Sequence, residues 1–422
     1  MQKQTVAIHA GYDKQSGNGE MSVPISQTTA FAFRDAEHAA NLFALKELGP
    51  IYTRLTNPTN EILEKRFAEY EGGVAAIALA SGQSAIFFAI ANVVEAGDNI
   101  LISDKLYGGA VTLLTLTMKR FGVTAKVFSA EHPDNLEAQI DDRTKAIFFE
   151  ALSNPQIAVA DIEQITTIAK RHGVMTICDN TVSSAALCSP LEWGVDIVIH
   201  STSKYTNGQG TAIGGIIVER EGMCAFFKAN GTRYPHFVEP DPSYHGLVYV
   251  DVPLPCFTLR ARLGLLRDFG AAQSPFNAWL LINGLETLDI RVQKHSDNAL
   301  TVAKFLETHP KVSKVNYPGL ASDTGYERAQ KYFREGKASG LISFEAESYE
   351  EAKRIIDSTE LFSVVVNIGD SKSLIVHPAS TTHSQLTEKE LEESGIKSTV
   401  VRLSIGLEDS RDLIADLEKA IG

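Results

Sequence analysis

Three apolar segments of this 422-residue sequence each end in polar side chains whose types could serve one reaction. Each segment is typical of a short buried strand. The residues that follow the three strands are Ser81 and Gly82, then Asp179, and then the run Ser201-Thr202-Ser203-Lys204. In an open parallel sheet, ligands bind beyond the carboxyl ends of the strands. We therefore expect these side chains to meet at one edge of a sheet.

Four of these groups could bind a phosphate. The amides of Gly82 and Gln83 open an expected helix, and free amides at a helix N-terminus attract anions. The hydroxyls of Ser201 and Ser203 would add further hydrogen-bond donors. The pattern predicts a phosphate cradle.

The two remaining groups, Asp179 and Lys204, suit an aromatic aldehyde. A carboxylate held against a ring nitrogen keeps that nitrogen protonated, and a primary amine can bond to an aldehyde carbon. Together with the cradle, this set matches pyridoxal phosphate. We expect the pKa of Lys204 to be lowered, because burial and a nearby cationic ring disfavour the ammonium.

Other interpretations fit parts of the pattern. Asp179-Asn180-Thr181 alone is more typical of a turn or a helix cap. Residues 201–204 also satisfy S-x-x-K, and Ser296-Asp297-Asn298 satisfies S-D-N, which are two marks of penicillin-recognising serine enzymes. The third mark, K-T-G, is absent, and we interpret residues 296–298 as the solvated surface of an amphipathic helix.

Neither a dinucleotide site nor a metal site is expected. Gly208-Gln209-Gly210 has the wrong spacing for a dinucleotide loop and precedes a strand, where a helix is required. The eleven histidines include no H-E-x-x-H motif, so the sequence predicts no metal centre.

Two further residues have more than one interpretation. Arg402 lies in the apolar run Val400–Ile405, and a buried guanidinium needs either an internal carboxylate or the carboxylate of a substrate. The residues alone favour the internal salt bridge. Tyr107, which precedes two glycines, could be a core residue or could stack on a planar ring.

The elements that must position these groups alternate along the chain. From about residue 61 to 220, short β-rich runs alternate with helical blocks, which predicts an α/β fold with a mostly parallel sheet flanked by helices. The uncharged segment Val74–Val94 is interpreted as a strand, a turn and a helix, because Ser81-Gly82-Gln83-Ser84 interrupts it. We expect an N-terminal arm over residues 1–60, a large ligand-binding domain over 61–256 with a functional insertion at about 223–255, and a smaller α+β domain over 257–422.

Composition excludes several classes of protein. The formal charge of -13 repels phosphate backbones and anionic lipid, which argues against nucleic-acid and membrane-surface binding. Four cysteines without a C-x-x-C pair do not form a disulfide framework. The N-terminal residues lack the apolar core of a signal peptide. A cytoplasmic protein is the expectation.

Several long motifs now point to one family. Asp179-Asn180-Thr181 and Ser201-Thr202-Ser203-Lys204-Tyr205 resemble the cysteine and methionine metabolism family of pyridoxal-phosphate enzymes. Tyr52–Thr59, Ser81–Ala85, Leu106–Gly109 and Arg402–Glu408 resemble that family as well. With motifs from Gln27 to Glu408, the resemblance covers nearly the whole chain.

The resemblance implies a fold-type-I transferase and a role for each motif residue. Lys204 would bond to the cofactor, Asp179 would pair with its ring nitrogen, and Tyr107 would stack on the ring and assist departure of the leaving group. The other implied cofactor contacts are Ser81, Gly82, Gln83, Ser201 and Ser203 at the phosphate, Asn154 near the ring hydroxyl, and Tyr52 and Arg54 at the phosphate of a neighbouring subunit. Arg402, with Asn367, would bind the substrate carboxylate, which replaces the internal salt bridge. The family usually forms homotetramers built from catalytic dimers.

Two segments point to a branch within the family. Glu239–Gly246, in the insertion, and Ala271–Asn277 resemble the branch that acts on O-acetyl-L-homoserine. The implied reaction is a γ-replacement in methionine biosynthesis, in which sulfide or a small thiol displaces acetate and yields homocysteine or methionine. Cystathionine γ-synthase and methionine γ-lyase are the alternatives. The former generally lacks the insertion, and the latter typically has a cysteine where this sequence has Gly109.

Three questions stay open at this point. The sequence does not separate an acetyl donor from a succinyl donor. It does not say whether sulfide, a thiol or a protein-bound group supplies the sulfur. A non-catalytic scaffold of the same architecture is disfavoured by the presence of both Lys204 and Asp179.

Overall fold

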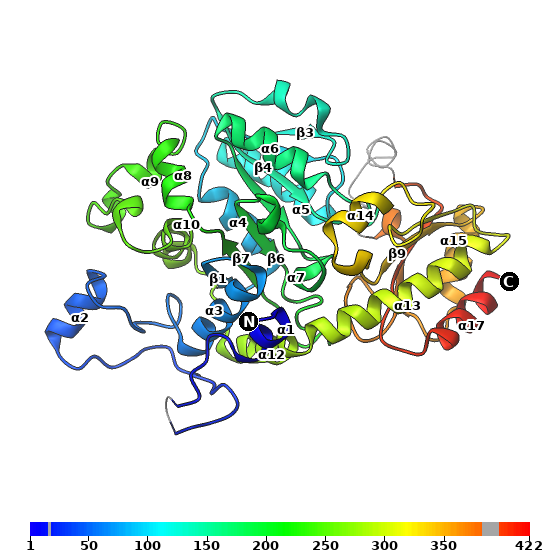
Figure 1. The fold of residues 1–422 in the computed structure, drawn as a ribbon, viewed down its shortest axis with the longest axis horizontal. Helices are drawn as coiled ribbons and strands as arrows, with labels where there is room; N and C mark the ends of the chain where they lie inside the picture. Colours follow the sequence, from blue (N-terminus) through cyan, green and yellow to red (C-terminus); the bar gives the residue numbers. More distant parts are fainter. Residues whose placement is uncertain (16–17, 382–395) are drawn as a thin grey trace. The chain divides into compact units, whose positions relative to one another are not determined.

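The computed structural model describes residues 1–15, 18–381 and 396–422, which form two β-sheets with helices around them (Figure 1). The larger sheet has the strand order β1-β7-β6-β5-β4-β2-β3, and the smaller has the order β10-β11-β12-β9-β8. The strands are β1 Ala75–Leu79, β2 Asn99–Ser103, β3 Thr124–Phe128, β4 Thr144–Glu150, β5 Met175–Asp179, β6 Ile197–His200, β7 Gly215–Glu219, β8 Lys314–Asn316, β9 Leu341–Glu345, β10 Ser363–Val364, β11 Leu374–Val376 and β12 Val400–Ser404.

The helices alternate with the strands through the first half of the chain, and the longest of them is α13, with 21 residues. They are α1 Lys3–His9, α2 Ala36–Phe43, α3 Pro58–Glu71, α4 Gly82–Ala91, α5 Gly108–Thr112, α6 Ile162–His172, α7 Ser184–Leu187, α8 Met223–Ala229, α9 Pro235–Val238, α10 Cys256–Arg260, α11 Arg267–Phe269, α12 Pro275–Glu286, α13 Leu288–Thr308, α14 Tyr326–Tyr332, α15 Tyr349–Ser358 and α17 Ser410–Ile421.

The expected α/β class with a mostly parallel sheet is confirmed. β3, β2, β4 and β5 pair in parallel, while β1 pairs with β7 in antiparallel register. Every residue of β2 and β4 is buried, because helical crossovers cover both faces of such a sheet and leave no polar face. The strand tips therefore bear the only polar groups of these segments that can reach a ligand.

Local sequence signals begin and end the crossover helices. Helix α6 begins after Asp161, whose carboxylate accepts the amide of Gln164, and it ends at Gly173 with a φ of 60°. The last turn of α6 contains three basic residues, which interact favourably with the negative end of the helix dipole. The helix is therefore one of the helical blocks that the sequence predicts between residues 61 and 220.

The chain divides into two compact units. The first unit comprises Met1–Val93, Ile199–Ser203 and Thr211–Glu286, and the second comprises Val94–Val198, Lys204–Gly210 and Thr287–Gly422. In the second unit, α13 packs against α17 and against β8 and β9 of the smaller sheet (Figure 1). Buried aliphatic side chains from these elements form one core. The boundary near residue 256 that the sequence suggests stays a prediction.

Two segments contain helices that the sequence analysis did not place: the N-terminal arm and the insertion. The N-terminal 60 residues, the predicted arm, contain α1, α2 and the start of α3. The insertion contains α8 and α9, and its aromatic side chains form a small core in which Phe227 and Phe237 stack with ring centroids 3.8 Å apart. The sequence does not reveal this core, because the ring contacts join positions too far apart to give a helical period.

The interpretation of residues 296–298 as solvated helix surface was wrong for Ser296 and Asn298. Ser296 and Asn298 are each 2% exposed. Asn298 donates to the backbone oxygens of Gly406 and Glu408 at 3.0 and 2.8 Å, and Ser296 donates to the backbone of its own helix. Asn298 therefore ties α13 to the segment that follows β12, and both residues have structural roles and not those of a serine hydrolase.

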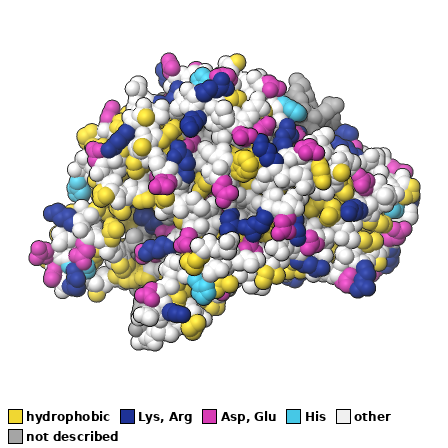
Figure 2. Space-filling view, in the orientation of Figure 1, with side chains coloured by type: hydrophobic (Ala, Val, Ile, Leu, Met, Phe, Trp, Pro, Cys, Tyr) yellow, Lys and Arg dark blue, Asp and Glu magenta, His cyan; other side chains and the backbone are white. Residues whose placement is uncertain are grey.

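The molecular surface mixes charges. On the face in Figure 2, acidic and basic side chains are interspersed. Among the described residues, no helix combines the length and the apolar character needed to cross a membrane. Within the same residues, no group of three or more histidine, cysteine, aspartate or glutamate side chains is arranged to hold a metal ion.

We predict that Phe237→Ala lowers the free energy of unfolding by about 3 kcal/mol, because it removes a fully buried ring from the insertion core. Phe269→Ala is the control, since Phe269 is 65% exposed and should change the value by about 0.5 kcal/mol or less. Guanidinium titration measures both. Equal losses in the two variants would contradict a packed insertion core.

Candidate active site

Lys204 and Arg402 share one asparagine in the second unit. Lys204 Nζ donates to Asn367 Oδ1 at 2.7 Å, and Arg402 Nη2 donates to the backbone oxygen of Asn367 at 3.1 Å. Asn367 lies in the turn between β10 and β11, whereas Arg402 is the central residue of β12. The small sheet therefore brings the predicted carboxylate-binding residues to the predicted cofactor lysine.

Arg402 is buried without a carboxylate partner. Its side chain is 2% exposed, and its Nη1 donates to Asn154 Oδ1 at 3.0 Å. Its Nε has no hydrogen-bond partner, and no described residue forms an ion pair with the guanidinium. Burial lowers the pKa of Arg402 to about 10, which still leaves it charged near neutral pH. The internal salt bridge is absent from the described residues, and a buried guanidinium with a spare donor is suited to an incoming carboxylate.

The same cation acts on Lys204. Burial, followed by the positive charge of Arg402, lowers the pKa of Lys204 to about 8. The lowering agrees in direction with the sequence expectation, although Arg402 and not a cationic ring supplies the charge here. The lysine is thus close to its neutral, nucleophilic form under mild conditions.

Two carboxyl groups end neighbouring strands of the large sheet. Asp179 is the last residue of β5, and Glu150, the last residue of β4, lies opposite it in the parallel register. Asp179 Oδ1 accepts the amide of Thr181 at 2.9 Å, so the turn-forming role that the sequence offered as an alternative is present as well. Burial, and then the charge of Asp179, raise the pKa of Glu150 well above its usual range.

Tyr107 and Asn154 lie on either side of Glu150. The amide of Tyr107 donates to Glu150 Oε1 at 2.6 Å, and the amide of Asn154 donates to Oε2 at 3.2 Å. Tyr107 directly precedes α5 and its side chain is 38% exposed, so the ring is not a core residue. Asn154 is buried and contacts Arg402 through its side chain.

Three residues of the predicted phosphate cradle lie together in the first unit. Ser81 caps α4, its Oγ accepting the amide of Ser84 at 3.1 Å. A Cβ atom added to Gly82 would lie 2.6 Å from the Cβ of Ser201, so only glycine permits this approach of the helix N-terminus to the serine. Gln83 is the exposed second residue of the helix. The site residues Ser81, Gly82 and Ser201 are therefore neighbours.

The remaining predicted residues of the first unit lie apart from this contact. Ser203 Oγ accepts the amide of Gly214 at 3.0 Å, so its hydroxyl already has a backbone partner. Tyr52 is 42% exposed, and the guanidinium carbon of Arg54 lies 5.3 Å from the centre of its ring. Arg54 is also exposed, so both side chains face solvent in the isolated chain.

The sequence analysis missed two residues at this site. Glu150 ends the apolar run of β4 with a charged side chain, which is the same signal that identified Asp179. Tyr205 follows Lys204 and is fully buried, its hydroxyl contacting Ser339 Oγ at 3.0 Å and the amide of Gly340 at 3.2 Å. No pattern in the sequence shows that contact, because Ser339 is distant along the chain.

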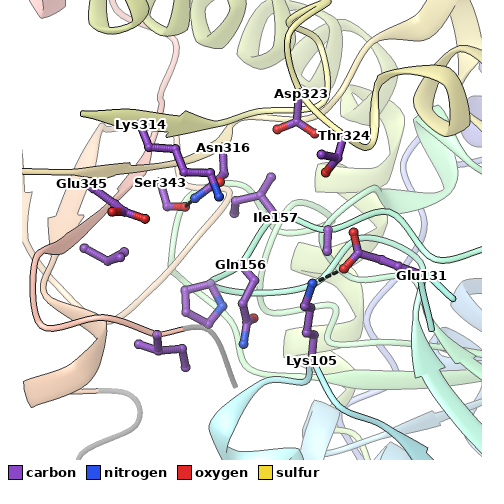
Figure 3. A pocket seen from close by; sticks show the side chains of 14 residues that line it. Lys105, Glu131, Gln156, Ile157, Lys314, Asn316, Asp323, Thr324, Ser343 and Glu345 are labelled. Atoms are coloured by element: carbon purple, nitrogen blue, oxygen red, sulfur yellow. Dashed lines mark hydrogen bonds and ion pairs between the residues drawn. The ribbon is translucent and has the colours of Figure 1, made fainter. Parts of the chain in front are cut away.

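A cavity of about 160 Å³ lies elsewhere in the second unit (Figure 3). Its lining includes Lys105, Pro155 and Val400, each within two positions of a predicted site residue. Lys105 forms an ion pair with Glu131 inside it, as the close-up shows. Lys204 does not line this cavity, so it is not the reaction site.

The whole chain matches one protein family. The model described as Cys/Met metabolism PLP-dependent enzyme matches residues 4–422. The chain belongs to this family. Pyridoxal phosphate is therefore its cofactor, as the strand-tip residues predicted.

Members of the Cys/Met metabolism family resemble the chain over its full length. An O-acetyl-L-homoserine sulfhydrylase from Leptospira meyeri is 46% identical, with 99% of this chain and 96% of that protein covered. A structure described as a candidate O-acetylhomoserine (thiol)-lyase from Campylobacter jejuni, with N'-pyridoxyl-lysine-5'-monophosphate, is 52% identical with a TM-score of 0.98 and covers 100% of both chains. A structure described as metB from Corynebacterium glutamicum is 31% identical with a TM-score of 0.86, covering 100% of this chain and 98% of that one.

The described residues fit the cofactor of the Cys/Met metabolism family. The contact between Gly82 and Ser201 leaves room for no side chain at the helix N-terminus, as a phosphate cradle requires. Lys204 has a lowered pKa, and a carboxylate ends the neighbouring strand β5. The first unit therefore supplies donors suited to a phosphate, and the second supplies an amine and a carboxylate suited to an aldehyde and a protonated ring nitrogen.

We predict that acylation of Lys204 by acetic anhydride in the cofactor-free protein rises about tenfold per pH unit up to about pH 8 and then levels off, because only the neutral amine reacts. Peptide mass spectrometry measures the labelling. The control is the same peptide in guanidinium-unfolded protein, where the inflection should return to about 10.4. An inflection common to both states would contradict the influence of burial and Arg402.

Proposed function

We propose that this chain is an O-acetylhomoserine sulfhydrylase, which transfers the four-carbon unit of O-acetyl-L-homoserine to sulfide or a small thiol. The products are L-homocysteine or methionine, and acetate, as a step of methionine biosynthesis. The observation that carries the proposal is the contact of Lys204 and Arg402 with one asparagine, which sets a nucleophilic amine beside a carboxylate-binding cation. The full-length relatives named for this activity support it.

Arg402 binds the α-carboxylate of the substrate in this proposal. Its Nε has no partner in the described residues, and a carboxylate can accept from that donor with charge assistance. Asn154 and Asn367 hold the other two guanidinium nitrogens, so the plane of the group is set before the substrate arrives. The arrangement reduces the ordering that binding requires.

Lys204 bonds to the cofactor at rest and moves protons during turnover. When bound, pyridoxal phosphate withdraws electrons from the substrate and stabilises negative charge on its carbon atoms. Lys204 Nζ, with a pKa of about 8, removes the proton from the α-carbon, releases it, and is then free to remove a proton from the β-carbon. Loss of acetate from the γ-carbon then opens that carbon to sulfide, and after sulfide has added, a proton returns to the β-carbon and another to the α-carbon. Tyr107 assists departure of acetate.

The other predicted site residues contact the ring and the phosphate of the cofactor in this proposal. Asp179 holds the proton on the ring nitrogen, and Asn154 lies near the ring hydroxyl. Ser81, Gly82, Gln83, Ser201 and Ser203 bind the phosphate. For Ser203 this requires the hydroxyl to share or exchange its contact with Gly214.

Gly109 supports this branch over a methionine γ-lyase. A Cβ atom at position 109 would lie 2.5 Å from Cε1 of Tyr107, so the present ring position excludes a cysteine there. Cystathionine γ-synthase, the other alternative, is disfavoured by the insertion, whose helices α8 and α9 surround a packed aromatic core.

We propose further that the chain forms a homotetramer of catalytic dimers in the cytoplasm. Tyr52 and Arg54 are exposed and would reach the phosphate of a neighbouring subunit. Exposed large apolar residues in the same arm, Phe43 at 52% and Leu48 at 67%, support its burial against another copy. The four cysteines are free thiols, which agrees with a reducing compartment. Residues 1–60, 61–256 and 257–422 are the proposed arm, large domain and small domain.

We predict that the purified holoprotein converts O-acetylhomoserine and sulfide to homocysteine, and that it turns over O-succinylhomoserine, or cysteine as co-substrate, more slowly. Lys204→Ala should lower kcat by about 10³-fold or more, because it removes the base. Chromatographic assay of homocysteine and acetate measures both. Release of 2-oxobutyrate without added sulfide would favour the lyase instead.

We predict that mixing two inactive variants, Arg54→Ala and Lys204→Ala, restores activity after subunit exchange. If Arg54 serves the neighbouring site, each hybrid dimer has one intact site, and about a quarter of all sites recover. The unmixed variants are the controls. If Arg54 serves its own subunit, the mixture stays as inactive as the separate variants.

A further inference from the structure

Glu150 is a buried acid that the reaction described above does not use. It is 5% exposed and ends β4, directly across the parallel register from Asp179. Neighbouring strands lie about 4.8 Å apart, so the two carboxyl groups share one edge of the sheet. Glu150 thus lies beside Asp179, the proposed partner of the ring nitrogen.

Both oxygens of Glu150 accept backbone amides of predicted site residues. Oε1 accepts from Tyr107 at 2.6 Å and Oε2 from Asn154 at 3.2 Å. Neither amide belongs to a strand or to a helix interior, so the carboxyl group substitutes for the regular bonds that these segments lack. One side chain therefore fixes two loops that leave different strands.

Each loop leads to a different part of the site. Tyr107 presents its half-exposed ring, the proposed stacking partner of the cofactor. Asn154 Oδ1 accepts a hydrogen bond from Arg402, so the position of Asn154 affects that of Arg402. Asn367 in turn bonds to both Arg402 and Lys204. A shift of the Glu150 carboxyl group would therefore move the ring-stacking and the carboxylate-binding groups together.

We propose that Glu150 is a positioning residue, whose carboxyl group sets Tyr107 and Asn154, and through them the cofactor ring and Arg402, in one geometry. The inference rests on the proposed roles of Tyr107 and Arg402. Glu150 touches neither substrate nor cofactor in this account. Its effect passes through the two backbone amides.

Glu150→Gln tests the proposal with little change of shape. The amide nitrogen of glutamine cannot accept a hydrogen bond, so either Tyr107 or Asn154 loses its acceptor. We expect the dissociation constant for pyridoxal phosphate and the KM for O-acetylhomoserine each to rise about tenfold. In the cofactor-free variant, peptides containing residues 107 and 154 should exchange amide hydrogens faster. Glu150→Asp, which keeps two acceptor oxygens, should recover part of each loss.

Glu219→Gln is the matched control. Glu219 also ends a strand, is 1% exposed, and accepts the amides of Phe257 and Thr258 at 3.1 and 2.8 Å. Its replacement should cost stability and leave cofactor affinity and KM unchanged. If Glu150→Gln and Glu219→Gln give the same pattern, Glu150 is only a structural acid and the proposal fails.

Two outcomes separate this inference from the proposed function. If the wild-type protein does not turn over O-acetylhomoserine, the proposed function fails, while the cofactor affinity and the exchange data still decide the role of Glu150. If Glu150→Gln does not fold, exchange in the wild-type protein decides it. The amides of Tyr107 and Asn154 must then exchange slowly, and exchange as fast as an unprotected loop overturns the proposal.

Discussion

Two cationic side chains, Lys204 and Arg402, are held near each other by Asn367, and the rest of the site depends on how their charges are shared. A buried charge without a partner is unfavourable, so one of the two groups must give up its proton more easily. Arg402 keeps its charge, and the pKa of Lys204 falls to about 8. The arginine therefore prepares the lysine for covalent chemistry while keeping a donor for an anionic substrate.

Burial shifts the pKa of the acidic group Glu150 in the opposite direction from that of the lysine. Glu150 and Asp179 end adjacent strands, and burial raises the pKa of Glu150, the less exposed of the two. Because the pKa of Glu150 is raised, Asp179 is the carboxyl group better suited to pair with a protonated ring nitrogen. The site thus offers a cation for a carboxylate and an anion for a pyridinium, which is the charge pattern of an amino acid joined to pyridoxal phosphate.

The sequence predicted those site residues that end a strand or belong to a long family motif. Asp179 and Lys204 follow apolar runs, so their places at the sheet edge could be expected, and the family motifs assigned Arg402 to the substrate. The buried positions of Ser296 and Asn298 could not be expected, because Asn298 bonds to residues more than a hundred positions away. Glu150 ends a strand as Asp179 does, yet only the structure shows that it accepts the amides of Tyr107 and Asn154.

Covalent attachment of the cofactor to Lys204 is the central claim. Borohydride reduction of the yellow holoprotein, followed by proteolysis and mass spectrometry, locates the attached group directly. The account predicts a reduced pyridoxyl phosphate on the peptide that contains Lys204 and on no other. Attachment to a different lysine, or cofactor binding without any reducible bond, would contradict it.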